Sequence, residues 1–288
     1  MKIENYRPIT LTNTDYKILT KTITTKLEKL VHKIIHPNQA GFIPKRGLYN
    51  HTRITEAIVH YYETYEEDDY IMALDQEKAY DKIAYDYLWK TLKQFNFPQK
   101  FIFKIKELYK NAGTIVFVNK MLPEAIKIEK GVRQGCPMSC LLYNIAIEPL
   151  AEIIRRSTLK GFRIKGIKER TLVSLFANDT LVYMNKTDKK QILENIINTF
   201  CKASIAKFNK EKTKILPIGS EKYRKLVIEK KQTSESKEDK MSQLCHGPVV
   251  TYCMVYHYTK RAMLARLLAN EGPAIYVVHL NRYFVIPP

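Results

Sequence analysis

Two short apolar runs around a polar pair constrain the fold of this chain most strongly. Leu172–Phe176 and Leu181–Met184 flank Asn178–Asp179 in the stretch TLVSLFANDTLVYM. Apolar runs this short on either side of an Asn-Asp pair are typical of a β-hairpin rather than a helix. The hairpin therefore carries a single carboxylate, that of Asp179, at its tip.

Helical and strand patterns alternate along much of the remaining chain. Apolar residues recur at helical spacing over 16–35, 52–65, 78–95 and 141–154, and again from a Thr187/Asp188 cap to Phe200. Residues 70–74 and 114–119 have the composition of strands. Because a hairpin interrupts the alternation, we expect an α+β fold with a mixed or antiparallel sheet backed by helices, not a doubly wound parallel sheet.

Charge and composition indicate the class of partner. The chain has 288 residues, is 45% hydrophobic and carries a formal net charge of +19, which favours a polyanion such as nucleic acid as partner. A basic ribosome-like or membrane-surface protein is the alternative, but an aromatic content of 11% favours a folded domain over a basic tail. Five unevenly spaced cysteines indicate a reducing compartment. No signal peptide and no apolar run of about 18 residues is present, so no membrane partner is expected.

Two carboxylates end apolar segments. Asp75 closes the strand over 70–74, and Asp179 lies at the hairpin tip. If the two segments are neighbours in one sheet, the carboxylates meet at its edge and offer the oxygen ligands that Mg²⁺ prefers. Two such ions, about 3.5–4 Å apart, serve phosphoryl-group chemistry in many enzymes. The alternative is that an Asp after a strand only forms a turn or caps a helix.

Two loops offer groups suited to a nucleotide. In GVRQGCP, Gly131 and Gly135 free the backbone around Gln134 for a close approach to a ligand. In FIPKRG, Lys45 and Arg46 are candidate triphosphate ligands, although paired cations are also common on ordinary surfaces.

Six ordered blocks of the sequence resemble one known family. They are the opening NYRPITL with YKILTKTITTKL, then HPNQAGFIPKR, LDQEKAYDKI, GVRQGCPMSCLLYN, LFANDTLVY and FCKASIAKFNKEKTK. From about Asn5 to about Leu216 the chain resembles the reverse transcriptase of non-LTR (LINE-type) retrotransposons. The resemblance implies a right-hand polymerase fold with fingers and palm.

The resemblance also implies an activity and a set of site residues. The implied reaction is RNA-directed DNA polymerisation with two Mg²⁺ ions, an RNA template, a DNA primer and deoxynucleoside triphosphates, after translation in the cytoplasm and with action in the nucleus. Matched to the family's motifs, the residues are Asp75 and Asp179 as metal ligands, Tyr80 as the gate against a ribose 2′-hydroxyl, Gln134 and Gly135 beside the nucleotide and template, Lys45 and Arg46 at the triphosphate, and Lys212 near the leaving pyrophosphate.

The hairpin departs from the family at one metal-binding position. Asn178 stands where the family has the first of two aspartates, so an amide replaces a charged ligand. Losing a principal electrostatic group lowers a rate by about 10²–10³-fold or more. Three hypotheses follow: a polymerase with lowered activity, a catalytically dead basic protein that still binds RNA or a hybrid duplex, and a decayed reading frame whose product does not fold stably.

Three further departures occur outside the hairpin. Cys140 replaces a proline, and Lys45 and Ile205 replace glycines of the family pattern. Cys140 suits the position as a small apolar residue. Ile205 is strained if its backbone requires a positive φ.

The family boundaries define the expected domains. We expect fingers and palm over 1–219, with fingers at about 1–70 and 96–130 and palm at about 71–95 and 131–219. Residues 220–242 are expected to be a charged linker or solvated surface. Residues 243–288 form an unassigned, frame-shifted or foreign tail, so the thumb is expected to be missing or replaced. The cysteines and histidines of this tail, Cys245, His246, Cys253 and His257, lack the C-x₂-C spacing of a zinc site.

Overall fold

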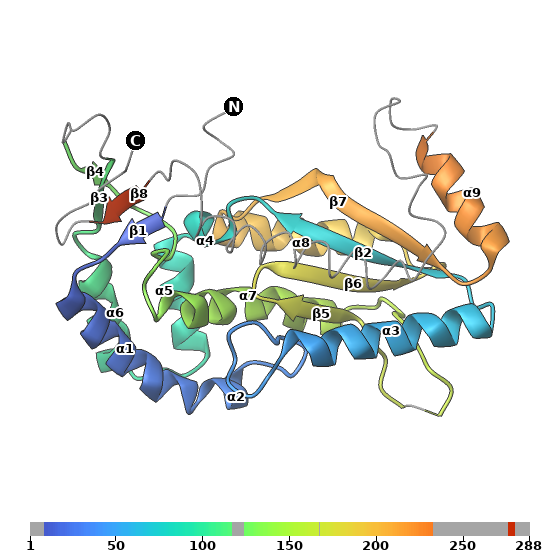
Figure 1. Ribbon diagram of the computed structural model, residues 1–288, viewed down its shortest axis with the longest axis horizontal. Helices are drawn as coiled ribbons and strands as arrows, with labels where there is room; N and C mark the ends of the chain where they lie inside the picture. Colours follow the sequence, from blue (N-terminus) through green and yellow to red (C-terminus); the bar gives the residue numbers. More distant parts are fainter. Residues whose placement is uncertain (1–8, 117–123, 167, 233–275, 280–288) are drawn as a thin grey trace, which may run out of the picture.

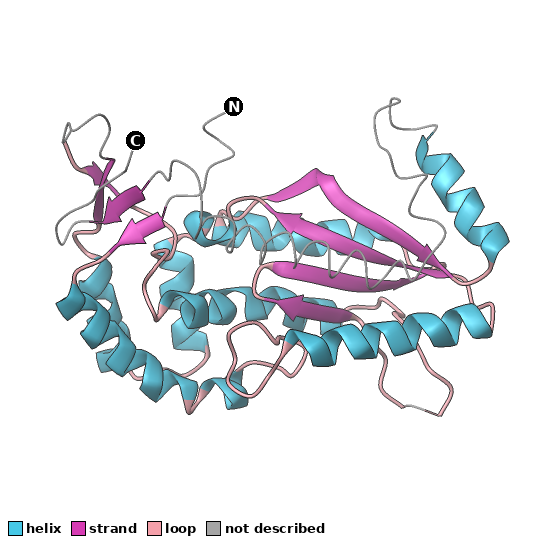
Figure 2. Ribbon diagram, viewed as in Figure 1, coloured by secondary structure: helices cyan, strands magenta, loops and turns pink. Residues whose placement is uncertain are grey.

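The computed structural model describes residues 9–116, 124–166, 168–232 and 276–279. In this part of the chain two four-stranded sheets lie at separate places, and helices pack around them (Figures 1 and 2). Within it, no helix combines the length and the apolar character needed to cross a membrane.

The larger sheet is antiparallel throughout. Its strand order is β5 (Val173–Phe176), β6 (Asp179–Asn185), β2 (Asp69–Gln76), β7 (Phe208–Ile218). The hairpin predicted from the sequence is the β5–β6 pair, which places β6 against the strand that ends near Asp75. The α+β class with an antiparallel sheet is therefore confirmed.

Helices cover one face of this sheet. The helices are α7 (Ser139–Arg156), α5 (Tyr85–Gln94) and α8 (Lys190–Ser204). Their apolar side chains join alternate residues of the strands, such as Leu74, Val182 and Leu175, in the main core. This face is buried because side chains alternate between the two faces of a strand and its apolar set points at the helices.

Among the described residues, a helix covers one end of the opposite face. There α3 (Leu48–Thr64) contributes Ile58 and Tyr62 to a second cluster with Ile71 and Tyr183. Since residues two apart share a face, Asp75 lies on this same face of β2, beyond the residues that contact α3.

A smaller sheet and several helices make up the remaining described structure. The sheet order is β1 (Ile9–Leu11), β8 (Tyr276–His279), β3 (Gly113–Val116), β4 (Ile126–Lys127). The helices are α1 (Thr14–Glu28), α2 (Val31–Ile34), α4 (Ala79–Lys82) and α6 (Gln99–Tyr109). Figure 1 places the small sheet next to α1 and α6, at the end of the molecule opposite α9. Its strand β8 belongs to the segment that was expected to be an unassigned tail.

Several helices differ from the sequence prediction. The pattern over 16–35 is divided into α1 and α2, and the pattern over 78–95 into α4 and α5. Helix α6 was not predicted, although Ile102, Ile105 and Tyr109 lie one turn apart and are buried. Asp188 does not cap α8; its carboxylate accepts hydrogen bonds from the main-chain N–H groups of Lys160 (2.8 Å) and Asn185 (2.9 Å).

The charged segment after Ser220 is a helix where it is described. α9 (Glu221–Gln232) covers part of the segment 220–242 that was expected to be a charged linker or solvated surface, and all of its described side chains are exposed or partly exposed. The helix has an ion pair between residues one turn apart, Glu221 and Lys225, at 2.7 Å. A second ion pair, 2.5 Å long, joins Arg224 to Glu63 of α3. The straight-chain residues of this segment also favour a helix. The expectations for a thumb and for Cys245, His246, Cys253 and His257 lie outside the described residues.

Candidate active site

The sheet brings Asp75 and Asp179 to the same edge. In the β2–β6 pairing Leu74 lies opposite Thr180, and Asp75 and Asp179 each follow one residue farther toward that edge. Residues opposite each other on antiparallel strands project to the same face, so the two carboxylates share the face that α3 leaves uncovered. Both side chains are partly exposed. The arrangement offers two neighbouring carboxylates to solvent.

Asn178 occupies the turn beside this pair. It is 7% exposed, and its Nδ2 donates a hydrogen bond of 3.3 Å to Oδ1 of Asp179. No group of three or more acidic, His or Cys side chains placed to hold a metal ion occurs among the described residues. The donor set at the edge is therefore two carboxylates and one amide.

Gln39, a residue that the sequence pattern did not single out, holds the turn at Ala177 in place. Ala177 has a φ of 55°, a left-handed conformation that is uncommon without glycine. The Gln39 side chain pairs with it twice: Ala177 N–H donates to Gln39 Oε1 at 2.8 Å, and Gln39 Nε2 donates to Ala177 O at 3.1 Å. A β-carbon on Gly41 would lie 2.2 Å from the Ala177 nitrogen, so only glycine fits there.

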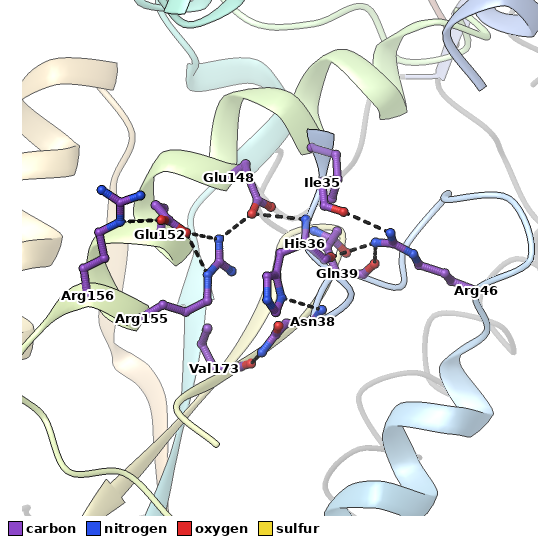
Figure 3. Close-up of polar contacts among 10 residues, drawn as sticks. All are labelled: Ile35, His36, Asn38, Gln39, Arg46, Glu148, Glu152, Arg155, Arg156 and Val173. Carbon is purple, nitrogen blue, oxygen red and sulfur yellow. Dashed lines mark hydrogen bonds and ion pairs between the residues drawn. The ribbon is translucent and has the colours of Figure 1, made fainter. Parts of the chain in front are cut away.

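Residues 36–46, here called the clamp loop, are anchored to α7 and to β5. The main-chain N–H of His36 donates to Glu148 Oε1 at 3.3 Å, and Arg155 holds the same oxygen at 2.5 Å (Figure 3). On the strand side, Asn38 Nδ2 donates to Val173 O at 2.5 Å. The clamp loop is thus fixed between the helix and the hairpin.

The two cations of the clamp loop differ in their surroundings. Arg46 donates to the carbonyls of His36 (2.7 Å), Gln39 (3.0 Å) and Ile35 (2.9 Å), so its guanidinium holds the loop together (Figure 3). Lys45 is exposed and has a φ of 63°. Of the pair, Lys45 is the cation that remains turned to solvent.

The GVRQGCP loop packs against α4. Gly131 passes so close that a β-carbon would lie 2.7 Å from Asp81 Cα, and its φ is 86°. Gln134 Nε2 donates to both carboxylate oxygens of Asp81, at 3.0 and 3.2 Å. Gly135 is exposed with a φ of 85°. Both glycines thus adopt a positive φ, a conformation that glycine reaches without steric cost.

An aromatic pair lies between this loop and β2. The rings of Tyr80 and Tyr143 stack with centroids 4.5 Å apart. The Tyr143 hydroxyl donates to Oε1 of Gln76, the residue after Asp75. Tyr80 is thereby connected through one ring to the strand that carries the candidate metal ligand.

Lys212 lies at the same sheet edge, in an irregular part of β7. Ala73 pairs with Lys214 but Asp75 pairs with Asn209, so residues 210–213 bulge out of the ladder. The side chain of Lys212 is exposed, and its main-chain N–H donates to Asn209 Oδ1 at 3.2 Å. The bulge brings a cation beside the strand end occupied by Asp75.

Two other departures from the family pattern, Ile205 and Cys140, lie at helix ends. Ile205 ends α8 with a φ of 62°. An isoleucine therefore occupies a left-handed position, where glycine is the usual residue. Cys140 is half-buried in the first turn of α7, and burial raises the pKa of its thiol.

Comparison with known proteins gives a match to one protein family and to several relatives. The protein family described as "Reverse transcriptase (RNA-dependent DNA polymerase)" matches residues 2–240. The chain is 32% identical over 218 residues to the "Transposon TX1 uncharacterized 149 kDa protein" of Xenopus laevis, covering 76% of this chain and 17% of that protein. It is 23% identical over 225 residues to the Pol polyprotein of the type-2 retrotransposable element R2DM of Drosophila melanogaster, covering 78% and 21%.

Among solved structures, the fold is similar to apo telomerase from Candida tropicalis. That match has a TM-score of 0.50 at 12% identity and covers 70% of this chain and 41% of the other. At this identity it shows a shared fold alone. The chain spans 17% and 21% of the length of the two transposon proteins.

Proposed function

The chain belongs to the reverse transcriptase (RNA-dependent DNA polymerase) family, as the reverse transcriptase domain of a non-LTR, LINE-type element, and on this premise we propose that its Asp75–Asp179 edge is a nucleotidyl-transfer site. The reaction joins a deoxynucleoside triphosphate to the 3′-hydroxyl of a DNA primer on an RNA template and releases pyrophosphate. The observation that carries the proposal is the placement of Asp75 and Asp179 on one face at one sheet edge.

The residues at this edge fit Mg²⁺. Carboxylate oxygens are the ligands it prefers, and it is commonly bound by one or two carboxylates plus substrate phosphates. Asp75 suits this role, because within the described residues no side chain donates a hydrogen bond to its carboxylate. Asp179 would be the second ligand, with the Asn178 amide oxygen beside it. When bound, the metal supplies a lowered pKa for the attacking hydroxyl and charge for the phosphoryl group.

Asn178 lowers the activity of this site. An amide brings no negative charge to a position next to two carboxylates, so metal binding and charge stabilisation are both weakened. We expect the loss to be about 10²–10³-fold or more, the size found when one electrostatic group is removed from an active site.

The surrounding residues define how substrates bind. Lys45 of the clamp loop and Lys212 of the β7 bulge are exposed cations, and we assign them to the triphosphate and the leaving pyrophosphate. Tyr80, fixed by its stack on Tyr143, follows Asp75 by five residues and is the aromatic residue that we assign to exclude a 2′-hydroxyl. The formal charge of +19 provides the salt-dependent attraction for template and primer. Translation in the cytoplasm followed by action at nuclear DNA is part of the same proposal.

A primer-extension assay tests the proposal. The Asn178→Asp protein is incubated with a DNA primer on a poly-A RNA template, deoxynucleoside triphosphates and Mg²⁺. We expect extension that needs the template and stops when the metal is chelated. A folded Asn178→Asp protein that extends no primer contradicts the proposal.

A second function is favoured by Asn178 itself. With its metal site weakened and its charge of +19 retained, the domain is also suited to hold RNA or a hybrid duplex without catalysis. Titration of a labelled hybrid at several salt concentrations tests this function. A linear fall of log affinity with log salt supports it, provided the native protein extends no primer; absence of binding excludes it.

A further inference from the structure

The geometry points to Gln39 as a positioning residue that holds the metal-binding turn in place. Its side chain is fully buried and makes both main-chain contacts of Ala177, one accepted and one donated. Its Oε1 also accepts the N–H of Gly41 at 2.9 Å. One amide group thus joins the clamp loop to the turn that carries Asn178 and Asp179.

The conformation of Ala177 makes this contact consequential. A non-glycine residue in the left-handed region persists only where surrounding contacts hold it. Ala177 directly precedes Asn178, so a change in its φ moves Asn178 and Asp179 relative to Asp75. Gln39 acts on the metal ligands through the main chain and does not itself belong to the donor set.

The clamp loop is rigid enough to act as the fixed side of this contact. Asn144 Nδ2, from the buried helix α7, donates to Gly41 O at 2.5 Å. Glu148 and Arg46 hold the loop farther back through main-chain groups. The turn is therefore positioned against α7, the most deeply buried helix described, rather than by the hairpin alone.

The loop also supplies a matched control. Asn38 is the neighbour of Gln39 and bonds to the same hairpin, but its partner is Val173 in strand β5, four residues before the turn. Asn38→Ala loosens the loop from the strand, whereas Gln39→Leu removes the contacts to the turn at similar volume. Gln39→Glu keeps the acceptor for both N–H groups and loses the donated bond.

The first test uses the metal dependence of primer extension, which rests on the proposed function. In the Asn178→Asp protein, we expect Gln39→Leu to raise the Mg²⁺ concentration for half-maximal rate by about 10–100-fold, as for other residues that orient metal ligands. Gln39→Glu lies between, and Asn38→Ala leaves the metal dependence unchanged. A folded Gln39→Leu protein with unchanged Mg²⁺ dependence overturns the inference, because a merely structural role lowers stability without shifting metal affinity.

The second test needs neither metal nor activity. Hydrogen exchange of the Ala177 amide is measured in the native protein and in its Gln39→Leu and Asn38→Ala variants. We expect faster exchange in Gln39→Leu only, because Ala177 loses its acceptor there. An unchanged rate overturns the inference. If Asn178→Asp extends no primer, the proposed function fails, and the exchange rate alone decides the role of Gln39.

Discussion

The two ends of strand β2 carry an aspartate each, on the same face, in opposite surroundings. Asp69 is 2% exposed and accepts hydrogen bonds from the main-chain N–H of Lys186 at 2.7 Å and from Asn185 Nδ2 at 3.2 Å. Asp75 is partly exposed, and no described side chain donates to it. An aspartate of a strand is therefore structural where the fold hydrogen-bonds its oxygens, and its oxygens are available for chemistry where the described residues leave them to solvent.

The largest expected effect separates the two ends by activity. Asp75→Asn in the Asn178→Asp protein removes a charged metal ligand, so we expect primer extension to fall by about 10²–10³-fold or more. Stability in urea should not fall, because none of the described side chains donates a hydrogen bond to this carboxylate. A variant that keeps its rate, or that unfolds, would remove the distinction between Asp75 and Asp69.

The next effect is on stability at the other end. Asp69→Ala leaves the partly buried N–H of Lys186 without its acceptor, so we expect the free energy of unfolding to fall by about 1–3 kcal/mol. Urea denaturation followed by circular dichroism measures it. Primer extension per folded molecule should stay unchanged in the Asn178→Asp background; a loss as large as that of Asp75→Asn would show that both ends serve the reaction.

The buried Asp69 should also make the free energy of unfolding depend on pH. Burial raises the pKa of Asp69 from 3.8 to about 6, so the folded protein binds this proton more tightly than the unfolded chain does. The Asp69 contribution to stability is therefore fully present below its unfolded pKa and is lost as the pH rises through about 6. We expect the free energy of unfolding of the native protein, relative to Asp69→Asn, to fall over this window. A difference that is flat across it would contradict the buried carboxyl.

The smallest effect concerns strain near the Asp75 end. Ser204 O accepts the N–H of Ala84 and Lys207 O accepts that of Glu77, so Ile205 lies in a segment paired with the chain just after Asp75. Ile205→Gly relieves a left-handed β-branched residue and should stabilise the protein by about 1 kcal/mol. Ile205→Ala, which keeps a β-carbon at positive φ, should gain less. Equal gains would assign the effect to the exposed side chain rather than to the backbone.

Part of this account was predictable because it depends on local pattern. The hairpin follows from short apolar runs around Asn178–Asp179, and the shared face of Asp75 and Asp179 follows from the period of a strand once β2 and β6 are neighbours. The left-handed backbone at Ile205 was predictable from the residue type that the family prefers there.

Other parts depend on contacts between distant segments. Gln39 and Ala177 are 138 residues apart, and no periodicity marks a polar residue in a loop as the partner of a turn. The engagement of Arg46 with main-chain carbonyls is equally invisible in a basic dipeptide. Helix α9 lies where charge density indicated a linker or solvated surface, and its ion pair to Glu63 of α3 joins segments far apart in the sequence.

The proposed reaction requires an intact fold, and the site proposed at Asp75 and Asp179 lacks one charge at Asn178. The most direct measurement is the rate of RNA-templated primer extension by the native protein and by Asn178→Asp, at the same Mg²⁺ concentration and with equal folded protein. We predict a rate at least about 10²-fold higher for Asn178→Asp. Equal rates would contradict the account, because Asp75 and Asp179 would then suffice and the amide at position 178 would be without consequence.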